Sequence, residues 1–429
     1  MSSPSFAPPL TRRRVLGAAG AWCVGAAADR ALAQAPRQLS VAAFPLLDKL
    51  IEGMAPRWQQ RHPGVALEVI SRQWMDHHTA MTTALSTASH LPDVMALEIG
   101  FVGRFGQGSG LEDLRQPPYH IEAEAGRWIR GAYEQGRNRR GEVVAAPADV
   151  GPGTMFYRAD VLDKAGVDPA RLSSTWDSYI DAGRQIQART GARLVGHALE
   201  LKDIVARTGI APGDGLYYGA DNRPQVSSAR FVRGFTLARQ VRQERLDGRY
   251  MIWTNEWVEA LRRGRVATAL TGAWMAGQLS GWLAPETAGL WRAAPLPEGA
   301  LIGYGGSSYA IPRRSDPATK ALAWDFIRMM TLDPVVQLHA FKQFDAFPTL
   351  QASLDDPFFD EPLPFLGGQR ARRQWRDTAR RLPAVPVHKQ NAFAEEVVGG
   401  ELDKVMDHGK DIAQALQDAA RLLARRANR

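Results

Sequence analysis

Aromatic and acidic side chains follow the ends of several short apolar segments in this 429-residue chain. Trp74, Glu98, Phe101 and Trp274 each lie at or just beyond the end of a segment that we predict to be a strand. Ligands of open α/β sheets bind beyond the carboxyl ends of the strands, so these side chains are expected to meet along one edge. Flat rings present apolar faces to the C–H side of a sugar, and carboxylates accept hydrogen bonds from its hydroxyl groups. The pattern therefore predicts a site for a polar, ring-shaped solute.

These residues can also be interpreted in two different ways. Phe347, which precedes Pro348 in a predicted loop, is assigned to the same rim, but ordinary packing in a core is the alternative for it and for each tryptophan. Glu98 and Asp149 could instead be the two carboxylates of a secreted polysaccharide-acting enzyme, which would face the scissile bond about 5–10 Å apart.

Motifs for cofactors, metals and nucleophilic catalysis are missing from the sequence. Gly213-Asp214-Gly215 lacks the third glycine of a dinucleotide-binding loop, and no Gly-x-Ser-x-Gly or His-Glu-x-x-His motif occurs. His77 and His78 are neighbours on a predicted helix, so their side chains diverge by about 100° and are not expected to share a metal ion. We therefore expect no cofactor, no metal site and no enzymatic activity.

The elements that must position these residues alternate between helix and strand. Predicted strands cover residues 65–70, 93–98, 142–147, 154–158, 265–270 and 304–311, and predicted helices cover residues 46–58, 76–89, 175–189, 228–245, 255–263 and 317–330. Strand–helix–strand units at this spacing imply parallel pairing through crossover helices, which is an α/β layer. Thr175 is predicted to cap its helix through its hydroxyl group. Beyond Asp333 the pattern is helical and is interrupted by prolines.

Residues 1–35 have the pattern of an export signal. Arg12–Arg14 precede an apolar run that ends at the small-x-small sequence Ala31-Leu32-Ala33. Adjacent arginines before such a run resemble a twin-arginine signal, and the general secretory route is the alternative. The mature chain is therefore expected to be periplasmic.

The single cysteine and part of the positive charge fall within this predicted leader. Cys23 follows the bulky Trp22 where a lipoprotein signal has a small residue, so we expect no lipid anchor, and the mature chain has no thiol for a disulfide. The formal net charge of +8 includes the leader arginines, and the remainder is spread along the chain. Such a distribution is typical of a solvated surface, so we expect a soluble protein that does not bind nucleic acid.

Five stretches of the chain occur in an order that is typical of one protein family. They are Trp58–Val69, Leu91–Met95, Asp149–Arg158, Thr175–Asp177 and Gly264–Trp274. Leu91–Met95 resembles that family's APDV strand, Thr175–Asp177 its TWDE helix start, and Gly264–Trp274 its GKAAM…GPW segment without the usual proline. From Gln38 onward, the chain is thus similar to the extracellular solute-binding proteins of ABC importers, a group that includes the maltose-binding proteins.

This resemblance implies an α/β fold of the type II periplasmic binding protein class, with two lobes, a ligand cleft between them and a helical C-terminal part. By position, the first lobe would hold residues 37–147 and 276–312. The second lobe would hold residues 148–275 and 313–429.

The resemblance also implies a set of ligand contacts. Trp274 would stack on the ligand, Trp74 would lie on the first-lobe wall, and Glu98 and Asp149 would bond polar ligand groups. The complete set of expected contacts is Phe44, Trp74, Glu98, Phe101, Asp149, Trp274, Gly306, Ser307 and Phe347.

The function implied by the resemblance is capture of a sugar or oligosaccharide by lobe closure, followed by delivery to the membrane permease subunits of an ABC importer. The protein would act as a monomer and perform no chemistry. Three different functions stay open beside it: a polysaccharide-acting enzyme, a binding protein that feeds a sensor or chemoreceptor, and a binding protein for a glycerol phosphodiester.

Overall fold

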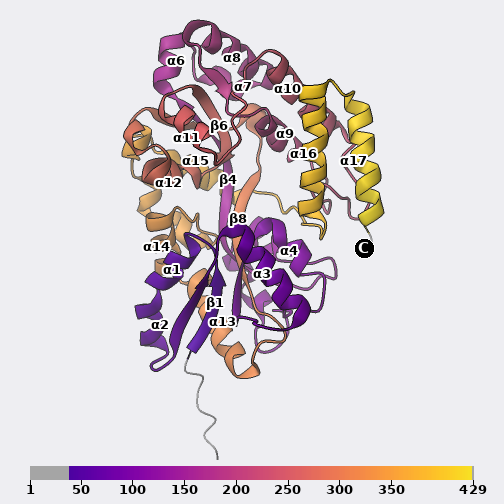
Figure 1. Cartoon of the computed structure of the whole chain (residues 1–429). Coiled ribbons are helices and arrows are strands. Elements are labelled where there is room, and N and C mark those ends of the chain that lie inside the picture. The colour runs from indigo at the N-terminus through magenta and orange to yellow at the C-terminus, as the bar shows by residue number, and fades with distance from the viewer. Residues whose placement is uncertain (1–37, 428–429) are drawn as a thin grey trace, which may run out of the picture.

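The computed structural model describes residues 38–427, so the export signal predicted for residues 1–35 lies outside the described residues. The chain forms two α/β lobes, one above the other in Figure 1. The strands are β1 (Gln38–Ala43), β2 (Ala66–Ser71), β3 (Val94–Glu98), β4 (Ala146–Arg158), β5 (Arg193–Val195), β6 (Val266–Gly272), β7 (Trp291–Ala294) and β8 (Gly303–Ala310). Between residues 38 and 427, every helix is too short or too polar to cross a membrane.

Helices cover both lobes. Those of the first half of the chain are α1 (Leu47–Gly53), α2 (Ala55–Arg61), α3 (Trp74–Thr87), α4 (Ile99–Phe105), α5 (Arg130–Gln135), α6 (Ala159–Ala165), α7 (Ala170–Ser174), α8 (Trp176–Thr190) and α9 (Leu199–Ala206). Those that follow are α10 (Ala229–Gln243), α11 (Asn255–Arg262), α12 (Met275–Gln278), α13 (Pro317–Leu332), α14 (Pro334–Phe344), α15 (Ala371–Arg380), α16 (Asn391–His408) and α17 (Ile412–Arg426). Thr175 caps α8 by accepting a hydrogen bond from the Ser178 amide at 3.0 Å, as the sequence predicts.

The strands follow the order β2-β1-β3-β8-β4-β6-β5, and β7 pairs with β4. In the first lobe, β1 runs parallel to β2 and β3, and in the second lobe β5 runs parallel to β6. The two halves are joined by β8 and β4, which pair antiparallel to each other at the centre of the molecule (Figure 1). Parallel strands joined through helices are what the alternating sequence pattern predicts.

β4 is one continuous strand that serves both lobes. Its first part pairs with β8, and its second part pairs with β6 and β7. The sequence predicts two strands here, separated by Asp149–Gly153. The structure instead keeps the segment extended and places register shifts between Pro147 and Asp149 and between Val150 and Pro152. Proline cannot donate to a strand ladder, so such shifts are where a sheet tolerates it.

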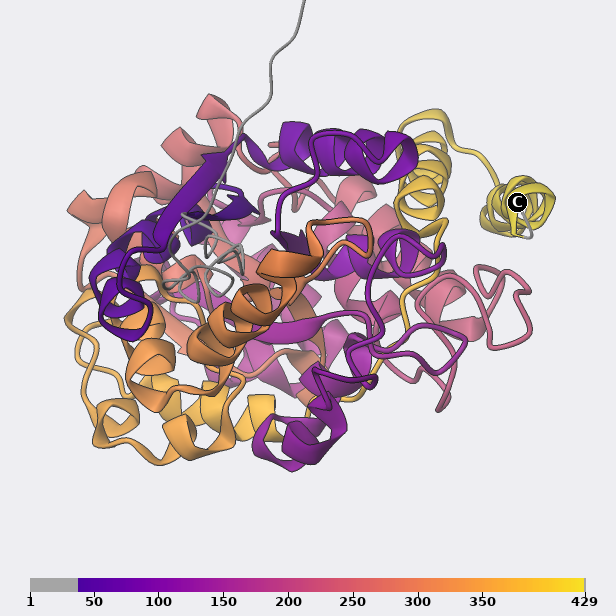
Figure 2. The ribbon, with the colours of Figure 1, turned by 90° about the horizontal axis from the view of Figure 1, so that it is seen from below.

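The expected lobe boundaries differ from the packing in two places. α13, expected in the second lobe with the rest of residues 313–429, buries Phe326 and Ile327 in the same core as Val41 of β1. Figure 2 shows this helix, in orange, lying across the first lobe as seen from below. Residues 276–302, expected in the first lobe, bury Leu283 in the second-lobe core that also contains Phe156 of β4. An amphipathic helix shows an apolar face in its sequence but does not show which sheet that face covers.

The C-terminal part is helical, as expected. α16 and α17 pack against each other and against α10, and Leu402 and Leu416 are buried in the second-lobe core. α16 also contacts α4 of the first lobe, so the C-terminal part spans from one lobe to the other.

Candidate ligand-binding site

Two carboxylates and a serine meet where β3, β8 and β4 lie side by side. Ser307 of β8 is in register with Glu98 at the end of β3 and, on its other side, with Asp149 of β4. Gly306 is needed next to them because its φ is +132° and a Cβ there would lie 3.0 Å from the Asp149 carbonyl oxygen. The structure therefore brings together four residues that the sequence assigns to the site.

Both carboxyl groups have raised pKa values. The pKa of Glu98 is raised to about 7, chiefly because burial removes solvent and also because the Glu395 and Asp149 carboxylates are near, against the lowering effect of the Gly100 amide and of Arg207. Burial also raises the pKa of Asp149 to about 6, opposed by hydrogen bonds from Ser307. Near neutral pH these groups can therefore both accept and donate hydrogen bonds, which suits a ligand rich in hydroxyl groups.

The aromatic wall of the first lobe is built around His78. Phe101 stacks on the His78 ring with centroids 4.0 Å apart and an interplanar angle of 18°, and Phe44 lies 5.5 Å from the same ring. Trp74, on the first turn of α3, packs edge-on against Phe101 at 5.3 Å. Trp74 is 39% exposed whereas Phe101 is 8% exposed, so Trp74 forms the exposed surface, Phe101 packs against it, and Phe44 packs against the His78 ring.

His78 links this wall to the carboxylate at the end of β3. The Glu98 amide donates to His78 Nε2 at 3.1 Å, and His78 Nδ1 lies 2.7 Å from the Trp74 carbonyl oxygen. Because Nε2 accepts, Nδ1 carries the proton and the ring is neutral. Burial lowers the pKa of His78 to about 4. Neighbouring His77 lies 2.7 Å from the Ala96 carbonyl oxygen through Nε2, so backbone groups occupy a ring nitrogen of each histidine.

Trp274 lies on the second-lobe side, directly before α12. Its Nε1 donates to the Tyr304 carbonyl oxygen of β8 at 2.8 Å. Gly272 allows this approach, since a Cβ there would lie 2.4 Å from Trp274 Nε1. The ring is partly buried and is anchored on the strands that connect the lobes.

Phe347 is not part of this surface, and its assignment as a ligand contact is wrong. Its side chain is 1% exposed and packs against Phe341 at 4.9 Å and Phe359 at 5.6 Å. Its carbonyl oxygen accepts a hydrogen bond from the Val150 amide at 3.1 Å, so it supports β4 from the core. The apolar partners that bury this ring come from α14 and from a short helical turn, which the sequence pattern of the loop did not reveal.

The second lobe contributes charged residues that the sequence analysis did not assign to the site. The Arg207 guanidinium lies 4.9 Å from the centroid of the Tyr304 ring and donates to the Asp203 carbonyl oxygen at 2.9 Å. Arg207 and Glu395 both act on the Glu98 carboxylate, so second-lobe charges face the end of β3. Arg207 directly follows α9 and Glu395 lies on α16, and no sequence motif marks either position.

A small pocket of about 50 Å³ lies beside these residues. It is lined by His197, Leu199, Glu200, Asp203, Met251, Ile252, Trp257, Ala269, Leu270, Thr271, Met275 and Tyr304. Glu200 accepts hydrogen bonds from the Leu270 amide at 3.0 Å and the His197 amide at 3.2 Å, and burial raises its pKa to about 8. The buried Thr271 hydroxyl finds no hydrogen-bond partner among residues 38–427. The neutral Glu200 carboxyl and the Thr271 hydroxyl can therefore both form hydrogen bonds with a polar ligand group in this pocket.

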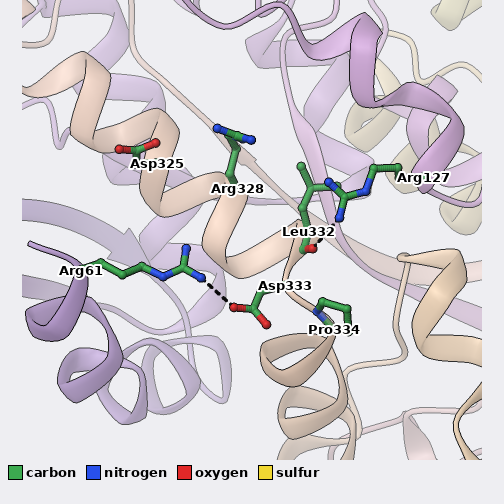
Figure 3. Close-up of a pocket in the computed structure, with 7 residues that line it drawn as sticks. All are labelled: Arg61, Arg127, Asp325, Arg328, Leu332, Asp333 and Pro334. Atoms are coloured by element: carbon green, nitrogen blue, oxygen red, sulfur yellow. Dashed lines mark hydrogen bonds and ion pairs between the residues drawn. The ribbon is translucent and has the colours of Figure 1, made fainter.

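A larger, open pocket of about 410 Å³ lies on the first lobe, between α2, α13 and the start of α14 (Figure 3). Its cationic groups are engaged by neighbours: Arg61 pairs with Asp333 at 2.8 Å, and Arg127 donates to the Leu332 carbonyl oxygen at 3.0 Å. None of its lining residues belongs to the strand-end site.

The sequence pattern of the bacterial extracellular solute-binding proteins matches residues 54–363. The lactose-binding protein of Rhizobium radiobacter is 24% identical over 364 residues, which cover 81% of this chain and 82% of that protein. The arabinooligosaccharide-binding protein of Halalkalibacterium halodurans is 23% identical over 328 residues, which cover 74% of this chain and 72% of that protein.

Solved structures show the same fold. The ABC transporter associated binding protein of B. animalis subsp. lactis in complex with beta-1,6-galactobiose has a TM-score of 0.74 and 23% identity, covering 91% of this chain and 98% of that one. The sugar-binding protein MalE of Xanthomonas citri has a TM-score of 0.75 and 20% identity, with coverage of 91% and 97%. These likenesses confirm the two-lobe fold, and the family match covers most of the described residues. The chain belongs to the family of bacterial extracellular solute-binding proteins.

Proposed function

We propose that this protein is the periplasmic substrate-binding component of an ABC importer, and that it captures a sugar or oligosaccharide by closing its two lobes around it. The observation that carries the proposal is the meeting of Glu98, Ser307 and Asp149 between aromatic residues of opposite lobes, Trp74 and Trp274. Carboxyl groups flanked by flat rings suit the hydroxyl groups and C–H faces of a sugar. The names of its relatives, which bind lactose and arabino-oligosaccharides, support this ligand class.

In this proposal, closure is driven by contacts that exist only when the lobes meet. Trp74 and Glu98 act from the first lobe, Trp274 and Arg207 from the second, and Asp149 from the strand that joins them. A ligand that touches all of these stabilises the closed state and shifts the population toward it. The closed, loaded protein would then dock on the permease subunits as a monomer. No covalent step and no cofactor are part of this proposal.

A thermal-shift screen of the mature protein tests the ligand class. A ligand raises stability by RT ln(1 + [L]/Kd), which is about 2.7 kcal/mol at a hundredfold excess over Kd, so a true ligand produces a clear rise in melting temperature. Mono-, di- and oligosaccharides would be compared with glycerol phosphodiesters. A rise with a saccharide is expected, whereas a rise with a phosphodiester alone would refute the sugar proposal.

Two further measurements distinguish a transport protein from an enzyme and from a sensor component. Chromatography of the bound saccharide after incubation should return it intact, and the appearance of shorter products would indicate an enzyme that uses Glu98 and Asp149. Deletion of the gene should abolish uptake of the identified sugar. Normal uptake with a lost chemotactic response would indicate a sensor pathway instead.

A further inference from the structure

Two exposed tryptophans lie beside the proposed site, outside the set of residues described for it. Trp253, in the loop before α11, is 49% exposed, and Trp282, in the π-helical turn η2 (Leu279–Leu283), is 54% exposed. Both are more open than Trp74, which is 39% exposed. Single exposed apolar side chains are common on protein surfaces, whereas exposed apolar side chains that lie next to one another mark an interaction surface.

The two rings continue from Trp274 in nearly parallel orientation. Trp253 lies 6.0 Å from Trp274 with an interplanar angle of 21°, and 6.2 Å from Trp282 with an angle of 13°. Fully overlapping rings in contact would have centroids about 3.5–4 Å apart, so centroids about 6 Å apart mean that neighbouring rings do not cover each other's faces completely. We call Trp274, Trp253 and Trp282 the tryptophan terrace. This incomplete overlap is consistent with Trp253 being half exposed although it lies between two rings.

The terrace is held in place by its surroundings. Trp282 Nε1 donates to Gln278 Oε1 at 2.7 Å, and Arg262 of α11 donates to the Trp282 carbonyl oxygen at 3.2 Å. Trp253 has a φ of +71°, a left-handed conformation that is unfavourable for a bulky residue and is maintained only where the surroundings impose it. α11 and α12, which flank the terrace, lie together at the left of the upper lobe in Figure 1. The rings thus form a preorganised surface.

The terrace is continuous with the proposed ligand site at one end. Trp274 donates to the Tyr304 carbonyl oxygen on the connecting strand β8, and Met251 and Ile252, which precede Trp253, line the pocket that contains Glu200. The other end, at Trp282, is open to solvent. The indole N–H groups of Trp274 and Trp282 are already used within the protein, so these residues offer ring faces rather than hydrogen-bond donors.

We propose that the tryptophan terrace is an outer carbohydrate subsite, and that it extends the binding site beyond the cleft to sugar units past the first two of an oligosaccharide. This inference rests on the proposed function, because it assigns the chain length of the same ligand class. Ring faces without free donors recognise the C–H face of a sugar and are indifferent to the pattern of its hydroxyl groups. The inner carboxylates would thus select the sugar, and the terrace would select for length.

Isothermal titration calorimetry of the purified mature protein tests this inference. The probes are saccharide series of two to five units: malto-oligosaccharides, arabino-oligosaccharides, and galacto-oligosaccharides beginning with lactose. For the series that binds, wild-type affinity should rise from the two-unit to the four-unit member. Trp282→Ala should lower affinity for the four-unit member about fivefold and change that for the two-unit member by less than about twofold, as expected for loss of one stacking contact. Leu422→Ala, an exposed apolar residue on α17, is the matched control and should change neither value.

Trp253→Phe and Trp253→Ala provide a second pair of variants. The phenylalanine keeps a flat ring and should retain most of the affinity for the longer saccharide, whereas the alanine should lose it. Circular dichroism and melting temperature establish that each variant is folded. If Trp253→Ala does not fold, the Trp282→Ala titration decides the question, because that side chain is mostly exposed.

Each outcome is decisive. A wild type that binds two-unit and four-unit saccharides equally overturns the terrace inference and leaves the proposed function standing. Equal losses for short and long saccharides in Trp282→Ala also overturn it. If Trp282→Ala binds short and long saccharides as the wild type does but sugar uptake in cells is reduced, the terrace is a permease-docking surface and the subsite inference is overturned. A wild type that binds none of the saccharides overturns both this inference and the proposed function.

Discussion

His78→Leu is the substitution that most directly tests the architecture of the first-lobe wall. The His78 ring accepts a hydrogen bond from the Glu98 amide, donates one to the Trp74 carbonyl oxygen, and stacks on Phe101 at 4.0 Å. Leucine keeps an apolar side chain of similar size but can form neither hydrogen bond. The change therefore removes the group that fixes two proposed ligand contacts, without touching either contact directly.

The expected loss of stability follows from these contacts. A net intramolecular hydrogen bond contributes about 0.5–1.5 kcal/mol, and leaving the Glu98 amide unpaired in a buried place costs about 1–3 kcal/mol. Part of the stacking on Phe101, about 0.5–1.5 kcal/mol for an aromatic pair, is also lost. These contributions overlap, so we expect the free energy of unfolding at neutral pH to fall by about 2–4 kcal/mol.

The acid sensitivity of the protein should change as well. The His78 pKa is lowered to about 4 by burial, whereas in the unfolded chain it returns to about 6.5. Between these values the unfolded state binds more protons, so the contribution of His78 to stability is complete above pH 6.5 and is lost as the pH falls toward 4. Between pH 7.5 and 4.5 this single group should account for about 2.5 kcal/mol of the wild-type loss. In His78→Leu that part of the loss should be absent.

Urea unfolding at pH 7.5 and 4.5, followed by circular dichroism, measures both effects. His408→Leu, at an exposed position on α16, is the matched control and should leave stability and its pH dependence nearly unchanged. Calorimetry on the folded fraction should also show weaker sugar binding for His78→Leu, since Trp74 and Glu98 lose their common support. If the free energy of unfolding of His78→Leu fell between pH 7.5 and 4.5 as much as that of the wild type, the conclusion that the His78 ring is neutral and makes two hydrogen bonds would be refuted.

Phe347→Ala should lower the free energy of unfolding by about 3–5 kcal/mol, because the ring is fully buried. The same variant should change sugar affinity by less than about twofold. An unchanged midpoint of urea unfolding would contradict the place of Phe347 in the core. Trp274→Ala should weaken sugar binding about tenfold with little change in melting temperature, and loss of folded structure would instead show that the ring is structural. Because burial raises the Glu98 pKa to about 7, wild-type affinity for a sugar that donates a hydroxyl hydrogen bond should rise as the pH passes through 7. Glu98→Gln should remove this dependence, and a flat wild-type profile in calorimetry would contradict it.

The parts of the fold that depend on local pattern could be predicted from the sequence. The alternation of apolar segments predicts the α/β layers, the Thr175 cap predicts the start of α8, and the strand-end rule predicts that Glu98 and Asp149 lie at the ligand-facing edge. Each of these inferences uses residues close together in the chain or a general rule for parallel sheets.

The parts that depend on distant partners could not be predicted. Phe347 looks like an exposed loop residue until Phe341 and Phe359 are seen to enclose it. Trp253 lies in a loop and stacks on Trp282 in a π-helical turn about thirty residues further along the chain. A π-helical turn is too short and too rare to be recognised from the spacing of residues in the sequence. Arg207 and Glu395 come near Glu98 only because α9 and α16 are packed in the second lobe.

The unbroken course of β4 bears on the order in which a solute is engaged. A strand shared by two bodies concentrates bending where its ladder is interrupted, and the two register shifts of β4 lie on either side of Asp149. A residue at the pivot of a rotation moves little, whereas residues farther along the lever arms travel most. Asp149 and its neighbour Ser307 would thus keep their arrangement in every state of opening and contact an arriving solute first. Trp74, on the first-lobe arm, would arrive last and set how long the solute stays.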